Sequence, residues 1–190
     1  MRKIGITGGI GSGKSVISHL LRIMGVPVYI ADDESKKLTN TSFEIREKLV
    51  ACFGESLYDN QTLNKAMLAS LIFSNEENLS CVNQIIHPIV LNHFIQWTNM
   101  QQTALVAMES AILFESGFNQ YMDTVITVTA PAEMRIRRVL SRDNITREQV
   151  LQRISSQWQE DEKVNLSTHI IINDDKCAII SQLEKILLIL

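Results

Sequence analysis

One short stretch near the start of the chain has the composition of a phosphate-binding loop. Residues 8–15 read GGIGSGKS and fit the pattern GxxxxGK[ST]. In such a loop the glycines let backbone N–H groups turn towards phosphate oxygens, the lysine reaches the β- and γ-phosphates, and the last hydroxyl ligates Mg²⁺. The stretch therefore predicts a site for ATP and Mg²⁺, and the alternative is a glycine-rich turn that binds nothing. The expected contact residues are Gly9, Gly11, Ser12, Gly13, Lys14 and Ser15.

A second cluster consists of arginines. Six of the nine arginines lie within residues 135–153, a stretch without lysine. The guanidinium fork suits planar, multidentate contacts with phosphate better than the point charge of lysine does. Arg135, Arg138 and Arg142 are spaced to share one helix face, so we expect a lid that neutralises phosphate charge and excludes water. The alternative is a solvated basic face balanced by nearby acidic residues.

Acidic residues follow two of the predicted strands. Asp32 and Asp33 come directly after a strand that ends near residue 30, and Glu109 and Glu115 follow a later one. Because parallel strands end at the same edge of a sheet, these acids should lie on the edge that carries the phosphate loop. A carboxylate there can accept the proton of an attacking hydroxyl or position hydrated Mg²⁺. For Asp32 and Asp33 the alternative is N-capping of a helix that starts at residue 34.

Strands alternate with helices along the parts of the chain that must position these residues. The apolar runs predict strands at residues 2–7, 26–30, 104–108, 124–128 and 169–172. Helical patterns follow most of them, with Pro131 at a first helical position and a capping box at Thr146 and Gln149. We therefore expect an α/β fold, a P-loop kinase core with a parallel five-stranded sheet.

The middle of the chain has a different pattern. Helical periodicities dominate residues 34–100, apart from a segment at 57–63 that predicts a small hairpin or a loop. We expect residues 1–33 and 101–190 to form the nucleotide-binding core, with the lid at about 135–157. Residues 34–100 are then a mostly helical insertion.

Composition excludes several classes of protein. The net charge of −3 gives no general attraction for nucleic acid, and no apolar run is long enough to span a membrane. We expect a soluble cytoplasmic protein acting on small molecules. The three cysteines are odd in number and form no CxxC, so they favour neither disulfides nor zinc, and small buried residues in a reducing compartment are expected.

With these motifs in view, the whole sequence resembles the dephospho-coenzyme A kinases, P-loop enzymes that use ATP to phosphorylate the 3′-hydroxyl of dephospho-CoA. The resemblance is carried by ITGGIGSGKS at residues 6–15, Ala31-Asp32, Ile86-His87-Pro88, Leu113-Phe114-Glu115, Arg138-x-x-x-Arg142-Asp143 and RISSQ at residues 153–157. It departs from the family in three places. Ile30-Ala31-Asp32 replaces the usual Asp-Ala-Asp, Glu109-Ser110-Ala111 replaces an Asp-x-Pro, and Asn173-Asp174 replaces Asp-Asn.

The resemblance implies specific roles for some of these residues. Lys14, Arg138 and Arg142 would stabilise the transferring phosphoryl group, and Asp32 would be the base. The insertion at residues 34–100 would form part of the acceptor site. Asp32, His87 and Glu115 would contact the acceptor, and Asn173 would lie beside adenine. Two alternatives remain. One is a different P-loop kinase that acts on another small molecule or nucleotide, and the other is a nucleotide-binding switch without acceptor chemistry.

Overall fold

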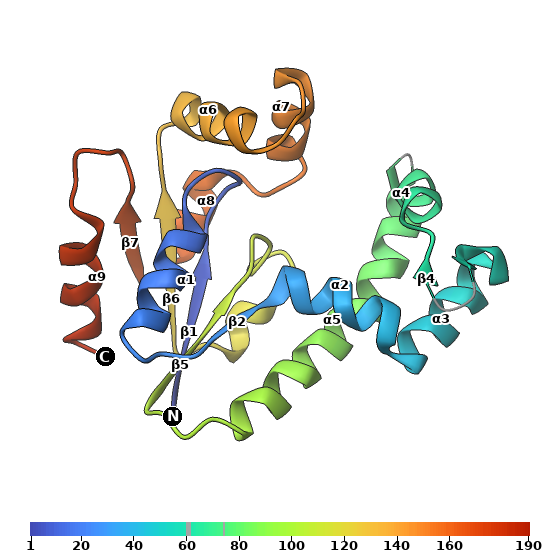
Figure 1. The fold of residues 1–190 in the computed structure, drawn as a ribbon, viewed down its shortest axis with the longest axis horizontal. Coiled ribbons are helices and arrows are strands. Elements are labelled where there is room, and N and C mark those ends of the chain that lie inside the picture. The colour runs from blue at the N-terminus through green and yellow to red at the C-terminus, as the bar shows by residue number, and fades with distance from the viewer. Residues whose placement is uncertain (60–61, 74) are drawn as a thin grey trace. The chain divides into compact units, whose positions relative to one another are not determined.

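The computed structural model describes residues 1–59, 62–73 and 75–190 (Figure 1). The chain divides into two compact units. Residues 1–30 and 101–190 make up the first, which we call the core unit, and residues 31–100 make up the second, which we call the helical unit.

The core unit is built on one parallel five-stranded sheet, with strand order β2-β5-β1-β6-β7. The first strand lies in the middle, so that the loop after it opens at the centre of the sheet edge. This arrangement confirms the predicted fold class. The strands are β1 (Arg2–Thr7), β2 (Val28–Ile30), β5 (Leu105–Glu109), β6 (Thr124–Thr129) and β7 (His169–Ile172).

One face of the sheet packs against α1 (Lys14–Ile23) and α9 (Ile179–Leu187). Ile17 and Leu21 of α1 and Leu183 and Ile186 of α9 pack against alternate residues of the strands. Ile4 and Ile6 of β1 are examples. Alternation with a period of two sends the intervening residues to the other face. There a side chain at Gly5 would meet the Leu113 methyl carbon at 2.7 Å, which explains why glycine occupies this position of a central strand.

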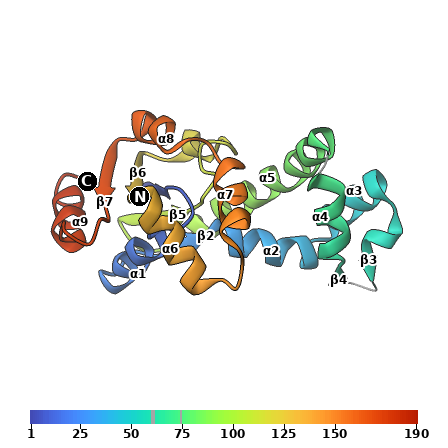
Figure 2. The same ribbon diagram turned by 90° about the horizontal axis from the view of Figure 1, so that it is seen from above.

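Three helices follow β6, namely α6 (Ala132–Arg142), α7 (Arg147–Ser155) and α8 (Glu160–Leu166). In Figure 1 α6 and α7 lie beyond the carboxyl ends of the strands, and Figure 2 shows α8 and α1 on opposite sides of the sheet. The predicted capping box of α7 is present, with Thr146 and Gln149 bonded to each other's backbone. Pro131 is the N-cap of α6 and not its first helical residue, because its ψ of 137° is still extended.

The helical unit contains α2 (Ala31–Thr41), α3 (Phe43–Phe53), α4 (Lys65–Phe73) and α5 (Glu76–Asn99), with a short 3-10 helix at Glu55–Leu57. The segment predicted as hairpin or loop forms two paired antiparallel strands, β3 (Tyr58–Asp59) and β4 (Thr62–Leu63). Its predicted turn at residues 60–61 lies outside the described residues. Within the described ranges, no helix combines the length and apolar character that crossing a membrane requires.

The helical unit has its own apolar core. It gathers residues from α3, from the hairpin and from α5, among them Ile45, Leu49, Leu57, Tyr58 and Val82. The three cysteines do not belong to it, because Cys52 and Cys177 are exposed and Cys81 is half-buried. The expectation that the cysteines are small buried residues was therefore wrong.

Candidate active site

The loop at residues 8–13 connects the central strand β1 to α1, as the sequence predicts. Gly13 has φ 100° immediately before the first residue of α1, and Gly11 has φ 79°, a conformation that side chains disfavour. A side chain at Gly11 would also meet the Arg135 carbonyl oxygen at 2.5 Å. Backbone N–H groups at the start of a helix and the positive end of its dipole attract anions, so this loop is a candidate phosphate site.

Lys14 and Ser15 begin α1 at this loop. The Lys14 Nζ donates to the carbonyl oxygens of Gly8 at 2.9 Å and Gly9 at 3.3 Å, so its ammonium lies over the loop. Ser15 is exposed in the first turn of the helix. The structure thus brings the predicted phosphate-binding residues into one concave turn of backbone.

Asn173, which follows β7, and Arg138 on α6 lie at the same edge of the sheet as this loop. The Asn173 Nδ2 donates to the Ser12 carbonyl oxygen at 2.8 Å, and Asn173 is 6% exposed. Arg138 on α6 donates to Asn173 Oδ1 at 3.2 Å and to Asp175 Oδ1 at 2.7 Å. Both predicted residues therefore lie beside the phosphate loop, and Asn173 couples it to the segment after β7.

Arg135 was part of the predicted arginine cluster but not among the predicted site residues. It is 5% exposed, its Nε donates to the Ile10 carbonyl oxygen at 3.2 Å, and it forms an ion pair with Glu160. A side chain at Gly9 would meet the Arg135 guanidinium carbon at 2.7 Å. Arg135 therefore packs against the phosphate loop, and the absence of a side chain at Gly9 leaves room for its guanidinium.

The outer arginines of α6 and α7 pair with carboxylates. Arg142 donates to Asp143 Oδ1 at 2.8 Å, and Arg153 donates to Asp143 Oδ2 at 3.2 Å. The hydrogen bond from Arg142 lowers the pKa of the Asp143 carboxyl below its usual value. Arg147 pairs with Glu133 in the same way. These contacts fit the alternative of a balanced basic face, and phosphate contact by Arg142 stays a prediction.

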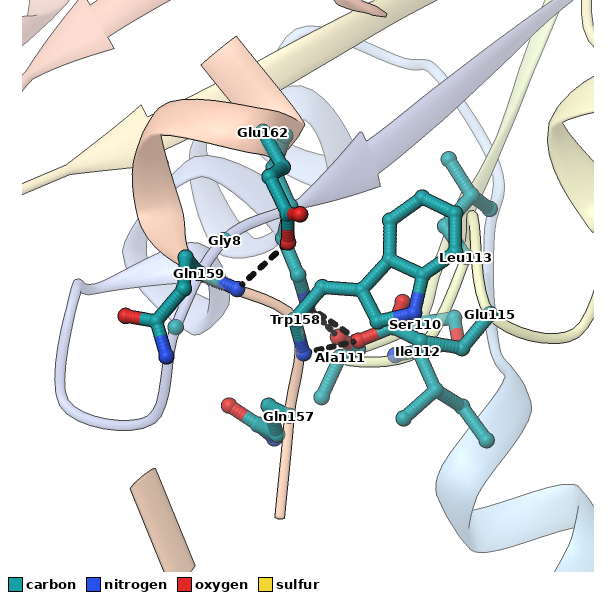
Figure 3. Close-up of polar contacts among 12 residues, drawn as sticks. Gly8, Ser110, Ala111, Ile112, Leu113, Glu115, Gln157, Trp158, Gln159 and Glu162 are labelled. Atoms are coloured by element: carbon teal, nitrogen blue, oxygen red, sulfur yellow. Dashed lines mark hydrogen bonds and ion pairs between the residues drawn. The ribbon is translucent and has the colours of Figure 1, made fainter. Parts of the chain in front are cut away.

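Glu115 connects the segment after β5 to the segment before α8. Its Oε1 accepts hydrogen bonds from the Trp158 backbone N–H at 3.0 Å and forms an ion pair with Lys163 Nζ at 2.7 Å. Figure 3 shows the Glu115 side chain beside the Trp158 backbone. Lys163 is fully buried, and its ammonium also donates to the Ala111 carbonyl oxygen at 2.7 Å. Acceptor contact by Glu115 stays a prediction, since one of its oxygens is already occupied by this link.

The neighbouring Gln157 carries the link onward to the phosphate loop. Its Oε1 accepts a hydrogen bond from the Ile10 N–H at 3.1 Å. Gln157 belongs to the RISSQ motif, and that motif was the only signal in the sequence that could have marked it. The segment from Gln157 to Lys163 thus holds both the loop after β1 and the loop after β5.

A carboxylate and hydroxyls lie at the same edge of the sheet. Glu109 ends β5 beside Ile6 of β1, and its Oε2 accepts a hydrogen bond from Ser18 Oγ at 2.5 Å. Ser15 lies one turn before Ser18 on α1. Hydroxyl and carboxylate oxygens are donors that Mg²⁺ prefers, so the residues present fit this ion.

Asp32 and His87 belong to the helical unit. The helix after β2 begins at Ala31, so Asp32 and Asp33 lie in its first turn, where acids favour the helix dipole. The alternative that Asp32 or Asp33 is the N-cap of a helix starting at residue 34 was wrong, because the helix starts at Ala31 and contains both residues. His87 is half-buried on α5, and burial lowers the pKa of its imidazole below 6.5.

The fold and the loop together define a class, the P-loop kinases. Shikimate kinase from Acinetobacter baumannii, solved in complex with shikimate, has the same fold with a TM-score of 0.57 and 17% identity, covering all of this chain and 92% of its own. That likeness concerns the fold alone.

Comparison of sequences gives the family. The family model for dephospho-CoA kinase matches residues 2–178. A dephospho-CoA kinase from Bacteroides fragilis is 48% identical over 186 residues, which cover 97% of this chain and 91% of that protein. The crystal structure of TT1252 from Thermus thermophilus superposes with a TM-score of 0.84 at 34% identity, covering 99% of this chain and 95% of that one. The chain belongs to the dephospho-CoA kinase family.

Proposed function

We propose that the chain transfers the γ-phosphoryl group of ATP to the 3′-hydroxyl of dephospho-CoA, giving coenzyme A and ADP. The observation that supports this most directly is the Lys14 ammonium lying over the loop at the start of α1, in a chain of this family. Phosphoryl transfer needs positioning and neutralisation of charge more than covalent chemistry by the protein.

On this proposal the nucleotide binds along the loop after β1. The backbone N–H groups of Gly9, Gly11, Ser12 and Gly13 and the Lys14 ammonium hold the phosphates. Asn173, which already fixes the Ser12 carbonyl, lies beside adenine. Arg138 is anchored by Asn173 and Asp175 at the same place, so a modest side-chain movement brings its guanidinium to phosphate oxygens.

Magnesium fits the oxygen donors at the sheet edge. Ser15 would hold the ion through its hydroxyl, and Glu109 would accept hydrogen bonds from waters of the ion. When bound, Mg²⁺ neutralises charge on the β- and γ-phosphates. Arg142 leaves its contact with Asp143 to complete the charge neutralisation from the lid.

The acceptor binds through the helical unit and the loop after β5. Asp32 accepts the proton of the 3′-hydroxyl while that oxygen attacks the γ-phosphorus. His87 and Glu115 contact other parts of dephospho-CoA. Because the pKa of His87 is lowered by burial, its imidazole is neutral at pH 7 and can accept or donate a hydrogen bond without charge.

The experiment is a transfer assay read by mass spectrometry. Dephospho-CoA incubated with the protein, ATP and Mg²⁺ should gain the mass of one phosphate, and ADP should appear in equal amount. Nucleoside monophosphates and shikimate, tested as acceptors, should remain unmodified. ADP release with one of those acceptors and none with dephospho-CoA would identify another P-loop kinase, and slow hydrolysis that no acceptor accelerates would identify a nucleotide switch.

A further inference from the structure

Two cysteines that are distant in the sequence meet in the helical unit. Cys52 is the penultimate residue of α3, and Cys81 lies in the second turn of α5. Their Sγ atoms are 3.3 Å apart, with the Cys81 thiol donating to the Cys52 sulfur. The two sulfurs are therefore in direct contact.

The packing of the two helices fixes this contact. Leu49, three residues before Cys52, is fully buried, and Val82, next to Cys81, is 4% exposed. Both belong to the core of the helical unit, which holds α3 against α5. The thiols thus lie at the rim of a packed interface, with their sulfurs at 3.3 Å held close to the bonding distance of about 2.0 Å.

The chemistry of the pair favours a disulfide over a metal site. A structural zinc ion takes four ligands. Within the residues that the structure describes, no group of three or more histidine, cysteine or acidic side chains could hold a metal ion. Cys52 is exposed and Cys81 is half-buried, so a small reagent reaches the pair from solvent.

We propose that Cys52 and Cys81 are a redox-active dithiol, which a low-molecular-weight disulfide oxidises to an intramolecular disulfide that joins α3 to α5. The Cys52 thiolate attacks one sulfur of the reagent, forms a mixed disulfide and releases one reagent thiolate. The Cys81 thiolate then attacks the Cys52 sulfur and releases the second. The two protons lost by the protein thiols go to the two released thiolates, so one disulfide is reduced and one is formed.

The order of attack follows from the surroundings of each thiol. Cys52 is the exposed member of the pair and accepts the hydrogen bond. That hydrogen bond raises the pKa of the Cys81 thiol, which therefore keeps its proton until Cys52 has reacted. Once formed, the disulfide closes the segment between the two helices into a covalent loop, so the helical unit is stabilised against unfolding.

The test uses the full chain with glutathione disulfide as the probe and peptide mapping without reductant. The wild-type protein should lose two hydrogen atoms and give a peptide of Cys52 joined to one of Cys81. Exposed Cys177 should instead retain a glutathionyl group, which shows that the reagent was active. Glutathionyl groups retained on both Cys52 and Cys81, or both left as free thiols while Cys177 reacts, would overturn the proposal.

Matched variants separate the pair from ordinary thiol reactivity. Cys81→Ser should leave Cys52 with a stable glutathionyl group, and Cys177→Ser should form the disulfide as the wild type does. Oxidation should raise the midpoint of thermal unfolding in the wild type and in Cys177→Ser, but not in Cys81→Ser. An equal shift in all three proteins would mean that no link between α3 and α5 had formed.

Discussion

The ammonium of Lys14 is held by two backbone carbonyl oxygens of its own loop. These neutral acceptors are weaker partners than phosphate oxygens, because a charged phosphate adds the attraction of opposite charges to the hydrogen bond. Nucleotide binding therefore exchanges weak contacts of this side chain for strong ones. The gain is largest where charge develops during transfer, so we expect Lys14 to act mainly on turnover.

Replacing this lysine tests that argument. Lys14→Ala should lower kcat by about 100-fold or more, by analogy with the loss of other charge-stabilising donors. The side chain is half-buried, and its hydrogen bonds to the Gly8 and Gly9 carbonyl oxygens stay within its own loop, so the variant should unfold close to the wild-type temperature. Steady-state kinetics and circular dichroism measure the two quantities. Lys185→Ala, at an exposed lysine of α9, is the control, and near-normal turnover of Lys14→Ala would remove the mechanism.

Asp32 and Asp33 form a matched pair for testing the base. Both are exposed and lie in the first turn of α2, and Asp33 pairs with Lys36 at 3.1 Å. Asp32→Asn should reduce kcat by about 100-fold or more with a smaller rise in KM, since general-base catalysis contributes at least that much. Asp33→Asn should leave kcat within a few-fold of the wild type. If Asp32→Asn changes only KM, Asp32 binds the acceptor and another group takes the proton.

At the scale of elements, the Glu115–Lys163 pair joins the loop after β5 to α8. A fully buried ammonium without its carboxylate is costly, and breaking such a pair at one partner costs about 3–5 kcal/mol. We therefore expect Glu115→Leu to lower the free energy of unfolding by about that amount. The double variant Glu115→Leu with Lys163→Met should recover most of the loss, because it leaves no buried charge.

Chemical denaturation of the two single variants and the double variant gives the interaction energy. Additive losses in the double variant would mean that the pair contributes no coupling. Its effect on activity is a separate measurement. Trp158 and Gln157 are connected to the same link, and Glu115 is also a proposed contact of the acceptor. A stable double variant with a reduced kcat and an unchanged KM for dephospho-CoA would therefore show that the link positions the phosphate loop.

His87 makes the helical unit sensitive to pH. Burial lowers the pKa of its imidazole in the folded state, whereas the unfolded chain takes up the proton near pH 6.5. Between pH 7.5 and 5 the unfolded state therefore binds more protons, and the free energy of unfolding falls as the pH falls. Urea titrations of the wild type and of His87→Gln over this range should give a smaller loss for the variant. His19→Gln, at an exposed histidine of α1, controls for loss of a histidine as such, and equal losses in the wild type and His87→Gln would contradict the assignment.

The elements of the core unit were predictable because each has a local signal. Continuous apolar runs marked the strands, and the four glycines before Lys14 marked the turn between β1 and α1. What stayed hidden depends on contacts between distant residues. No local sequence pattern indicates that Arg135 packs against Gly9, that Lys163 is buried against Glu115, or that Cys52 contacts Cys81. The start of α2 was also mispredicted, because its acidic residues resemble an N-cap but lie inside a helix that begins at Ala31.

In the molecule as a whole, the binding of anions depends on local groups and not on the net charge. The net charge of −3 repels anionic substrates at a distance. Five arginines of α6 and α7 pair with acidic side chains, so they add no free positive field. Affinity for a nucleotide therefore depends on the short-range donors of the loop after β1. On the proposed function, phosphates that reach these arginines would compete with their existing contacts to carboxylates, and nucleotide binding would then be coupled to the position of the lid.

The division into two units leads to the last prediction, which rests on the proposed function. Each unit has its own apolar core, so a ligand that binds one of them should slow amide hydrogen exchange chiefly in that unit. ATP with Mg²⁺ should protect residues 8–15 and the segment around Asn173, whereas dephospho-CoA should protect parts of residues 31–100, including α5 around His87. Hydrogen exchange followed by mass spectrometry measures both. The dephospho-CoA sample is kept free of its disulfide, and AMP is the control nucleotide without a γ-phosphate. If dephospho-CoA protected only the core unit, the helical unit would not be the place where the acceptor binds, while protection by ATP would still identify the phosphate loop.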